Sequence, residues 1–287
     1  MNEQRGGGVL ITGGTGFLGR ALAKELLREE HGHQRVCIYS RGEHAQADMF
    51  EALGSHPNLR MFVGDVRDRE RLYWALRSVD IVIHAAALKR IEVGHYNPGE
   101  LVKTNILGTA NVVDAAIAAG VRRVVLVSTD KACQPVSPYG VSKAMAEAVV
   151  LAANNTVAAG GTTFAVCRYG NVAGSTGSVI PRWRRILDTE PNPLAPCTDQ
   201  DCTRFWMTQG EAVALVLRAV QGVGPLLIPK LPAFRLGDLA EAMGFRGTLE
   251  FGLADWEKKH EMLEPGVTSD CAERMTVGAL KEALLHV

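Results

Sequence analysis

A short stretch near the middle of the chain collects residues that could move protons. Thr129, Asp130 and Lys131 come first, and Tyr139 and Lys143 follow. A lysine four residues after a tyrosine lies on the same face of a helix, so its ammonium can lower the pKa of the phenol. Without such a cation a phenol titrates at about pH 10 and is a poor base at neutral pH. The stretch therefore predicts a proton-transfer site, although the tyrosine–lysine spacing alone would also suit an ordinary surface pair.

A strand and a helix must position these residues. Residues 124–127 form an apolar β-branched run that is typical of a buried parallel strand. Strand and helix patterns alternate around it, with strands expected at 9–12, 36–40, 61–63, 81–84, 124–127 and 164–168, and helices at 17–28, 69–76, 100–119 and 139–159. This alternation predicts an α/β fold, a doubly wound parallel sheet of the Rossmann type.

The pattern changes after Gly170, where Gly and Pro become frequent and the elements shorten. A helix at 210–220 and a strand at 226–228 resume the alternation. We expect residues 1–170 and about 205–230 to form a dinucleotide-binding domain. Residues of about 171–204 and 231–287 are expected to form a smaller C-terminal substrate-binding lobe.

Composition excludes several classes of protein. The 287 residues carry 31 basic and 31 acidic side chains, so no net field attracts nucleic acid or an anionic membrane. The six cysteines form no Cys-x-x-Cys pair, which argues against a zinc site or a disulfide framework and favours reduced thiols. No apolar run approaches the ~20 residues of a membrane span, and Met1–Gly8 shows no signal-peptide pattern. A cytoplasmic protein without metal, membrane or nucleic-acid partner is expected.

A glycine-rich turn follows the first strand and opens the first helix. Its glycines permit a tight turn and a close approach of a pyrophosphate to the helix N-terminus. The predicted contacts are Gly13, Thr15, Gly16, Phe17, Leu18 and Gly19. The second strand ends at Ser40 and Arg41, where an acidic residue would indicate NAD. An arginine there suits the 2′-phosphate of NADP, which we therefore favour over NAD.

Two further strand ends are expected to contact the same cofactor. Asp65 and Val66 follow the third strand, and Asp65 could bond the adenine edge or could instead cap the helix beginning near Asp68. After the fourth strand the small residues Ala85, Ala86 and Ala87 leave room for the dinucleotide. Tyr139 and Lys143 complete the predicted cofactor set. His84, at the end of that strand, is better explained as a hydrogen-bonded structural residue than as an acid or base.

Together these segments resemble the extended short-chain dehydrogenases/reductases. Within them the chain is most similar to the soluble UDP-N-acetylglucosamine 4,6-dehydratases that invert C5, the type of pseudaminic acid biosynthesis. The matching segments are Ile11-Thr-Gly-Gly-Thr-Gly16, Tyr39-Ser-Arg41, Gly64-Asp-Val-Arg-Asp68, His84-Ala-Ala-Ala-Leu-Lys89, Tyr96-Asn-Pro98, Lys103-Thr-Asn-Ile106, Ser128-Thr-Asp-Lys131, Tyr139-Gly140, Lys143, Arg168-Tyr-Gly-Asn-Val172, Gly177-Ser-Val179 and Thr203-Arg-Phe-Trp206. The match is close to about residue 235 and thin afterwards.

The resemblance implies a redox-neutral reaction on a nucleotide sugar. Tyr139, held as a phenolate by Lys143 and the oxidised nicotinamide, takes the proton of the 4-OH while C4 is oxidised, and Thr129 bonds O4. Lys131 removes the proton from C5 if burial and the nearby cation lower its pKa. Protonated Asp130 assists departure of the 6-OH, C6 is reduced, and C5 is reprotonated on the opposite face.

The resemblance also implies a set of substrate contacts. They are Lys89, Asn105, Asn171, Val179, Arg204 and Glu257, with Arg204 as a fork donor to phosphate and Val179 against the base. Lys89 also fits an ordinary surface lysine. In the superfamily an asparagine at the position of Asn105 organises a proton-relay water or a backbone contact, and Asn105 also fits an ordinary polar helix residue. Trp206 is expected in the core.

The chain departs from the family pattern at two cations. Ala254 and Asp255 stand where the family has an Arg-Pro pair, and Thr176 replaces a second arginine. Arg182, Arg184 or Arg185 could compensate, or the substrate could be a different nucleotide sugar.

Two other functions fit parts of the pattern. An NADP-dependent nucleotide-sugar epimerase or reductase would need Tyr139 and Lys143 but not Lys131. A non-catalytic NADP-binding protein would need neither, and is disfavoured because every catalytic position is filled. The faces of the helices at 100–119 and 139–159 commonly pair subunits in this superfamily, so a homo-oligomer is expected.

Overall fold

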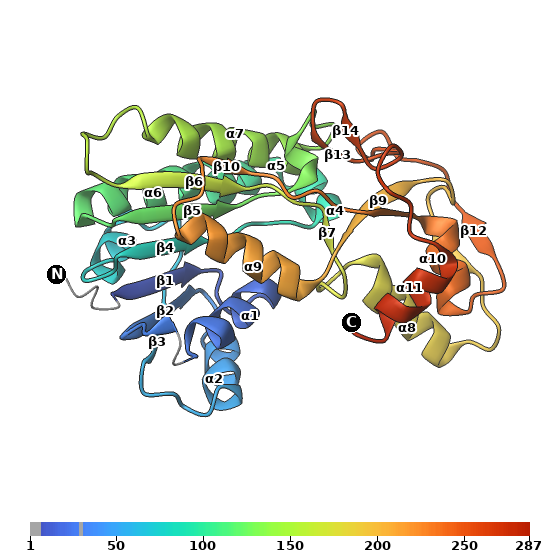
Figure 1. Ribbon diagram of the computed structural model, residues 1–287, viewed down its shortest axis with the longest axis horizontal. Coiled ribbons are helices and arrows are strands. Elements are labelled where there is room, and N and C mark those ends of the chain that lie inside the picture. Colours follow the sequence, from blue (N-terminus) through green and yellow to red (C-terminus); the bar gives the residue numbers. More distant parts are fainter. Residues whose placement is uncertain (1–6, 29–30) are drawn as a thin grey trace.

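The computed structural model describes residues 7–28 and 31–287. The predicted Rossmann-type sheet is confirmed: seven parallel strands lie in the order β10-β6-β5-β4-β1-β2-β3 (Figure 1). Their bounds are β1 Gly8–Thr12, β2 Arg35–Ser40, β3 Leu59–Val63, β4 Ile81–His84, β5 Arg123–Val127, β6 Thr163–Cys167 and β10 Leu226–Leu227. Because the strands are parallel, their carboxyl ends meet along one edge, where ligands bind in folds of this kind.

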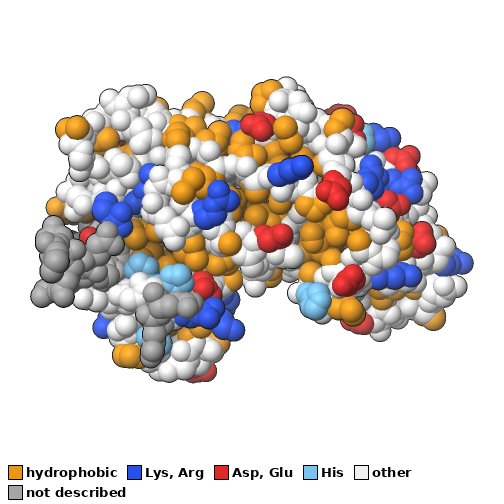
Figure 2. Space-filling model, in the orientation of Figure 1, with side chains coloured by type: hydrophobic (Ala, Val, Ile, Leu, Met, Phe, Trp, Pro, Cys, Tyr) orange, Lys and Arg blue, Asp and Glu red, His pale blue; other side chains and the backbone are white. Residues whose placement is uncertain are grey.

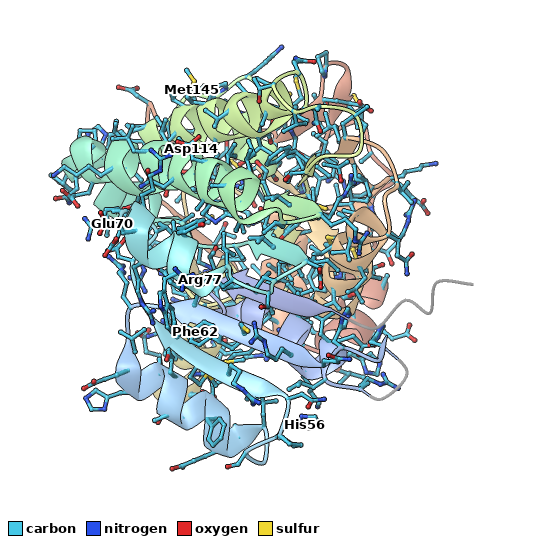
Figure 3. All side chains as sticks on the ribbon, turned by 90° about the vertical axis from the view of Figure 1, so that its left-hand side faces the viewer. His56, Phe62, Glu70, Arg77, Asp114 and Met145 are labelled. Carbon is cyan, nitrogen blue, oxygen red and sulfur yellow. The ribbon has the colours of Figure 1, made fainter. Side chains whose placement is uncertain are left out.

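Helices cover both faces of the sheet. On β1, Val9 and Ile11 join one apolar cluster and Leu10 joins the other, the period-two pattern of a strand buried on both sides. The first cluster lies under α1 (Phe17–Leu26), α2 (Glu43–Ala52) and α9 (Gln209–Val220). The second lies under α3 (Arg69–Ala75), α6 (Gly108–Ala119) and α7 (Pro138–Ala153). Figure 3 shows this second layer above the sheet, with the half-exposed Met145 of α7 on its outer surface.

The helices differ from the prediction in three places. Helix α2 was not predicted, because it buries only Gln46 and Met49 and so lacks a clear apolar stripe. The helix expected at 100–119 is assembled from α5 (Pro98–Leu101), a π-helical segment (Val102–Leu107) and α6. The helix expected to reach residue 159 ends at Ala153, because the Asn154 side chain bonds both backbone groups of Phe164 and turns the chain.

The residues beyond the sheet form a further apolar cluster at the far end of the molecule (Figure 1). All of its members except Trp206 come from 171–204 and 231–287, and Trp206 lies in the core against Phe234. The elements are β7 (Asn171–Val172), α8 (Val179–Thr189), β8 (Ala195–Cys197), β9 (Thr203–Met207), β11 (Ala233–Arg235), α10 (Leu236–Met243), β12 (Thr248–Glu250), β13 (Met262–Glu264), β14 (Val267–Thr268) and α11 (Val277–Leu284). The strands pair as β11-β9-β7, β12-β8 and β13-β14.

The space-filling view is hollowed at its lower edge, between the region of α1 and α2 and the region of α8 and α11 (Figure 2). The six cysteines are free thiols, five of them buried. No helix in residues 7–28 and 31–287 combines the length and apolar character needed to cross a membrane. Nor do those residues contain a cluster of His, Cys, Asp or Glu side chains suited to a metal ion. The segment without a signal-peptide pattern falls mostly on Met1–Gly6, which lie outside the described residues.

Gly19 tests the packing that sets α1 against the sheet. A Cβ on this residue would stand 2.5 Å from the Gly14 carbonyl oxygen, and its three nearest neighbours would all be backbone atoms. We expect Gly19→Ala to destabilise the protein by about 1–3 kcal/mol in urea unfolding. Gly99→Ala is the control, because a Cβ on that residue would meet nothing within 4 Å. Equal stabilities of the two variants would contradict this account of the packing.

Candidate active site

A cavity of about 1110 Å³ runs along the carboxyl edge of the sheet. It extends from the turn after β1, past the ends of β4 and β5, to the start of α8. Every residue that the sequence predicted as a cofactor contact lines it: Gly13, Thr15, Gly16, Phe17, Leu18, Gly19, Ser40, Arg41, Asp65, Val66, Ala85, Ala86, Ala87, Tyr139 and Lys143. The fold thus brings this set together, and their binding of a cofactor stays a prediction.

The glycine turn is shaped for a close backbone approach. Gly13 has φ +65°, and a Cβ there would lie 2.8 Å from backbone atoms of Ala86. Gly16 is the N-cap of α1 and makes no side-chain cap, so no cap side chain occupies the amide groups of the first turn, whose residues line the cavity. A dinucleotide pyrophosphate fits such a cradle.

The adenosine end of the predicted site carries one exposed cation. The Arg41 side chain is 59% exposed and its guanidinium lies 3.9 Å from Asp65. Asp65 itself accepts hydrogen bonds from the backbone and side chain of Arg67. The N-cap of α3 is Asp68, which accepts from the Arg71 amide, so the alternative role of Asp65 as that cap is excluded.

The acid–base residues follow β5, in a short 3-10 turn at Asp130–Ala132. The Asp130 side chain is fully buried, and its Oδ1 accepts from Thr129 Oγ1 at 2.9 Å and from Lys131 Nζ at 3.1 Å. Burial raises the pKa of Asp130, the direction that a general acid requires. Lys131 Nζ also contacts Glu261 Oε1 at 3.0 Å and the Asn171 amide oxygen at 3.4 Å.

Two electrostatic predictions were wrong. Lys131 was expected to have a lowered pKa, but the carboxylates of Asp130 and Glu261 outweigh burial and raise it. Lys143 was expected to hold Tyr139 as a phenolate, yet burial raises the pKa of Tyr139 to about 12, and the cation that opposes this shift is Lys131. The Lys143 ammonium instead donates to the Val127 carbonyl at 2.8 Å, and burial lowers its pKa to about 8.

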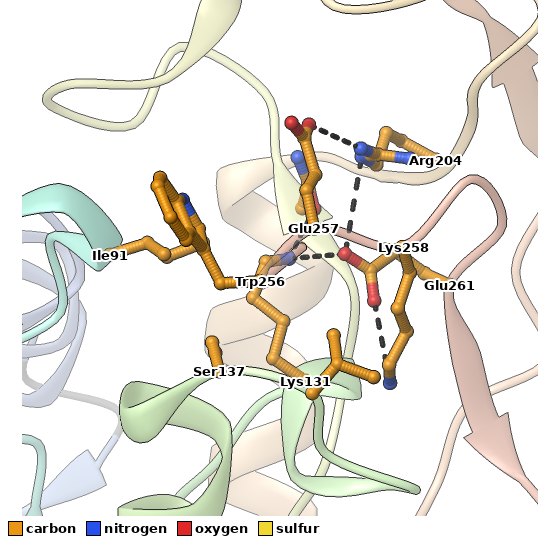
Figure 4. A pocket seen from close by; sticks show the side chains of 10 residues that line it. Ile91, Lys131, Ser137, Arg204, Trp256, Glu257, Lys258 and Glu261 are labelled. Carbon is orange, nitrogen blue, oxygen red and sulfur yellow. Dashed lines mark hydrogen bonds and ion pairs between the residues drawn. The ribbon is translucent and has the colours of Figure 1, made fainter. Parts of the chain in front are cut away.

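The predicted substrate residues divide between the cavity and its surroundings. Lys89 and Asn171 line the large cavity, and burial lowers the pKa of Lys89. Asn171 also lines a smaller adjoining pocket of about 180 Å³, together with Lys131, Arg204, Trp256, Glu257 and Glu261 (Figure 4).

Three of these residues are already engaged with the protein. The Arg204 fork donates to the Thr203 and Lys259 carbonyls and to Glu257, so it is not the free phosphate clamp that was predicted. Asn105 is buried in the π-helical segment and bonds both backbone groups of Leu88, away from the cavity lining. Val179 packs on the apolar cluster of the C-terminal lobe, because α8 is amphipathic and turns its polar face to the cavity.

The polar face of α8 carries residues that could compensate for the two missing arginines. Thr176 lines the large cavity, and so do Arg182 and Arg185. Arg184 points elsewhere and donates to the Leu284 and Val287 carbonyls. Of the three proposed compensating cations, the structure therefore leaves Arg182 and Arg185 at the site.

Sequence reasoning missed a buried ion pair beneath the catalytic turn. Glu147 of α7 accepts from Ser128 and binds the Arg168 guanidinium at 2.5 Å, while Arg168 donates to the Leu263 carbonyl of β13. Glu261, next to β13, was also missed. Spacing did not point to these contacts, since Arg168 is distant from Glu147 in the sequence and Lys131 is distant from Glu261.

The histidine at the end of β4 is structural, in line with its prediction. His84 is buried between the hydroxyls of Thr12 and Thr109, at 2.7 and 3.0 Å. Burial and Lys143 lower its pKa to about 3, so it stays neutral at physiological pH.

The fold and the site define an enzyme of the extended short-chain dehydrogenase/reductase class. The family model described as polysaccharide biosynthesis protein matches residues 9–274, and the chain belongs to that family.

The chain is similar to relatives with two different activities and to a solved structure. A UDP-N-acetylglucosamine 4,6-dehydratase (inverting) of Campylobacter jejuni is 43% identical over 258 residues, which cover 89% of this chain and 76% of the relative. A UDP-glucose 4-epimerase of Rickettsia akari is 38% identical over 264 residues, with the same coverage. The X-ray structure of Pen from Bacillus thuringiensis superposes with a TM-score of 0.90 at 32% identity, covering 99% of each chain. The names of the Campylobacter relatives denote a hydro-lyase activity, and the name of the Rickettsia relative denotes an isomerase activity.

Replacing Arg168 should lower the stability of the protein, because it leaves the buried Glu147 without its cation. Because Glu147 would remain charged in a dry site, we expect Arg168→Met to destabilise the protein by about 3–5 kcal/mol in urea unfolding. The double variant Arg168→Met with Glu147→Gln should recover most of that loss. If the double variant is no more stable than the single one, the pair is not the brace described here.

Lys143 predicts a specific dependence of stability on pH. Its pKa is about 8 in the folded protein, against an ordinary value of 10.5. The unfolded chain therefore binds more protons between these values, and stability gains from Lys143 as pH rises through that window. Relative to Lys143→Met, the wild type should gain on the order of 2–3 kcal/mol between about pH 8 and pH 10.5. Denaturant unfolding across that range measures the difference, and Lys103→Met, at an exposed lysine, should run parallel to the wild type.

Proposed function

We propose that the protein is an NADP-dependent nucleotide-sugar 4,6-dehydratase that acts on UDP-N-acetylglucosamine and inverts C5. The observation that carries this proposal is the Asp130–Lys131 acid–amine pair: Lys131 lines the large cavity together with Tyr139, and the buried Asp130 lies 3.1 Å from the Lys131 amine. An epimerase of this fold has no step that needs an additional acid and an additional base. The names and identities of the Campylobacter relatives support the same assignment.

Tyr139 would accept the proton of the sugar 4-OH, with Thr129 bonded to the same oxygen. A nicotinamide dinucleotide bound along the glycine turn would supply oxidation at C4 and reduction at C6. Lys131 and a positive nicotinamide ring would together favour the phenolate, since the protein's own groups leave the pKa of Tyr139 at about 12.

Asp130 and Lys131 would share the elimination of water. The proton at C5 becomes acidic once C4 is a ketone, and the Lys131 amine would remove it. Asp130, whose pKa burial raises, would donate its proton to the departing 6-OH. A carboxylic acid and an amine can divide these tasks because their neutral forms have opposite functions, one giving and one taking a proton.

Residues at the two ends of the cavity support the remaining assignments. Arg41 is exposed beside the predicted ribose position, which suits the 2′-phosphate of NADP. Arg182 and Arg185 would bind the UDP diphosphate in place of the arginines absent at Thr176 and Ala254. A cytoplasmic homo-oligomer is part of the proposal, on the grounds given by the sequence.

A second candidate is a nucleotide-sugar 4-epimerase, favoured by the 38% identity to the Rickettsia enzyme. It would use Tyr139 and Lys143 and leave Asp130 and Lys131 without a chemical task. The two candidates predict different products from the same substrate, a 4-keto-6-deoxy sugar against a 4-epimer.

Incubation with UDP-N-acetylglucosamine and NADP in deuterated water separates them. We expect one deuterium at C5 of an inverted 4-keto product, seen by mass and proton spectra. Lys131→Ala should lower dehydration by at least about 100-fold, because the base is lost. Lys281→Ala, an exposed lysine on α11, is the control and should match the wild type. A 4-epimer formed equally well by Lys131→Ala would establish the epimerase instead.

A further inference from the structure

Glu261 is a buried carboxylate in direct contact with the Lys131 amine. Its side chain is 3% exposed, and its Oε1 lies 3.0 Å from Lys131 Nζ and 3.9 Å from Arg204 Nε. Its Oε2 has no hydrogen-bond partner among the described residues and stands 3.8 Å from the Lys258 ammonium. Figure 4 shows the carboxylate between these three cations, at the wall of the smaller pocket.

Lys131 is surrounded by groups from several elements. Asp130 is on its own turn, Tyr139 on α7, Asn171 on β7, Arg204 on β9, and Glu257, Lys258 and Glu261 on the segment before β13. Of these, Asp130 and Glu261 are the acidic groups in contact with the amine. Glu257 is bound to Arg204 and Thr198.

The two contacting carboxyl groups are not equivalent. The pKa of Asp130 is raised, which favours its neutral form, whereas the cations around Glu261 lower the pKa of that group and keep it ionised. When Asp130 carries the proton of a general acid, the negative charge that holds the Lys131 ammonium therefore comes from Glu261. An ammonium cannot accept a proton from carbon, so this contact determines when Lys131 can act.

We propose that Glu261 is a positioning residue for the dehydration: its carboxylate fixes the Lys131 amine at the substrate and sets the pH at which that amine becomes a base. This inference rests on the proposed function. Nζ first loses one proton to solvent, and the neutral amine then takes the proton of the sugar carbon. Arg204 in turn positions Glu261, which explains why its fork is filled by protein groups.

Glu261→Gln tests the proposal, because it removes the charge and keeps the shape. An opposite charge within hydrogen-bond reach shifts a pKa by about 1–3 units, so the acidic limb of the pH profile of kcat/KM should move down by at least about one unit. Glu261→Asp keeps the charge, so its limb should stay within about half a unit of the wild type, with a lower kcat from the retracted carboxylate. Asp199→Asn removes an exposed ion pair with Lys259 on the same segment and should change neither.

A second measurement does not depend on turnover. Acetylation of Lys131 by acetic anhydride, followed by peptide mass spectrometry, reports the fraction of free amine at each pH. Its midpoint should fall by at least about one unit in Glu261→Gln, and stay near the wild type in Glu261→Asp and Asp199→Asn.

The outcomes separate the role of Glu261 from the proposed function. A shifted acetylation midpoint without any turnover of UDP-N-acetylglucosamine by the wild type would refute the proposed substrate and support the role of Glu261 toward the amine. The inference would be overturned if the wild type turns over normally and folded Glu261→Gln shifts neither the acidic limb of the pH profile of kcat/KM nor the midpoint of Lys131 acetylation. Glu261→Ala is a second charge-removing variant. If melting curves show that neither variant folds, Glu261 is needed for the fold itself and the inference also fails.

Discussion

The structure depends on one buried cation, the Lys131 ammonium, held between Asp130 and Glu261. Burying an ion costs several kcal/mol unless opposite charges and hydrogen bonds surround it. One of its carboxylates comes from the turn after β5, and the other from the segment before β13. The ion pair therefore joins the turn after β5 to the segment before β13, and Arg168, bonded to Glu147 and to the Leu263 carbonyl, makes a second connection to β13. The position of that segment and the chemistry of the amine depend on the same contacts.

The parallel sheet is what lets so few residues form a site. The ends of β1, β4 and β5 are neighbours along one edge, so a glycine turn, a run of alanines and the Lys131 amine, from distant parts of the chain, line one cavity. The strand ends are tied together beneath it by His84, which bridges the hydroxyls of Thr12 and Thr109. Because its ring nitrogens are hydrogen-bonded and uncharged, His84 holds the carboxyl edge of the sheet in place without adding a charge to the site.

Patterns that repeat locally were predictable from the sequence, and contacts between distant segments were not. Strands buried on both faces are continuous apolar runs, so the sheet and its order of elements followed directly. Helix α2 buries too few apolar residues to show a period, and Val179 was misplaced because the direction of α8 depends on the lobe that it covers. The sign of the Lys131 pKa shift was wrong for the same reason. The sequence places Lys131 next to Asp130, but Glu261 is far from Lys131 in the sequence, so its contact with the amine could not be predicted.

Catalytic and binding functions are held by different kinds of contact here. The acid–base residues are locked by buried partners on several elements, so a change at any of them disturbs the others. The cations available to a diphosphate, Arg182 and Arg185, stand on one polar helix face at the cavity wall, and no buried network among the described residues constrains them. A substitution at such a face alters the charge presented to a nucleotide with little effect on packing. This difference explains how the chain can lack two arginines of its family pattern while Asp130, Lys131 and Tyr139 keep an arrangement suited to proton transfer.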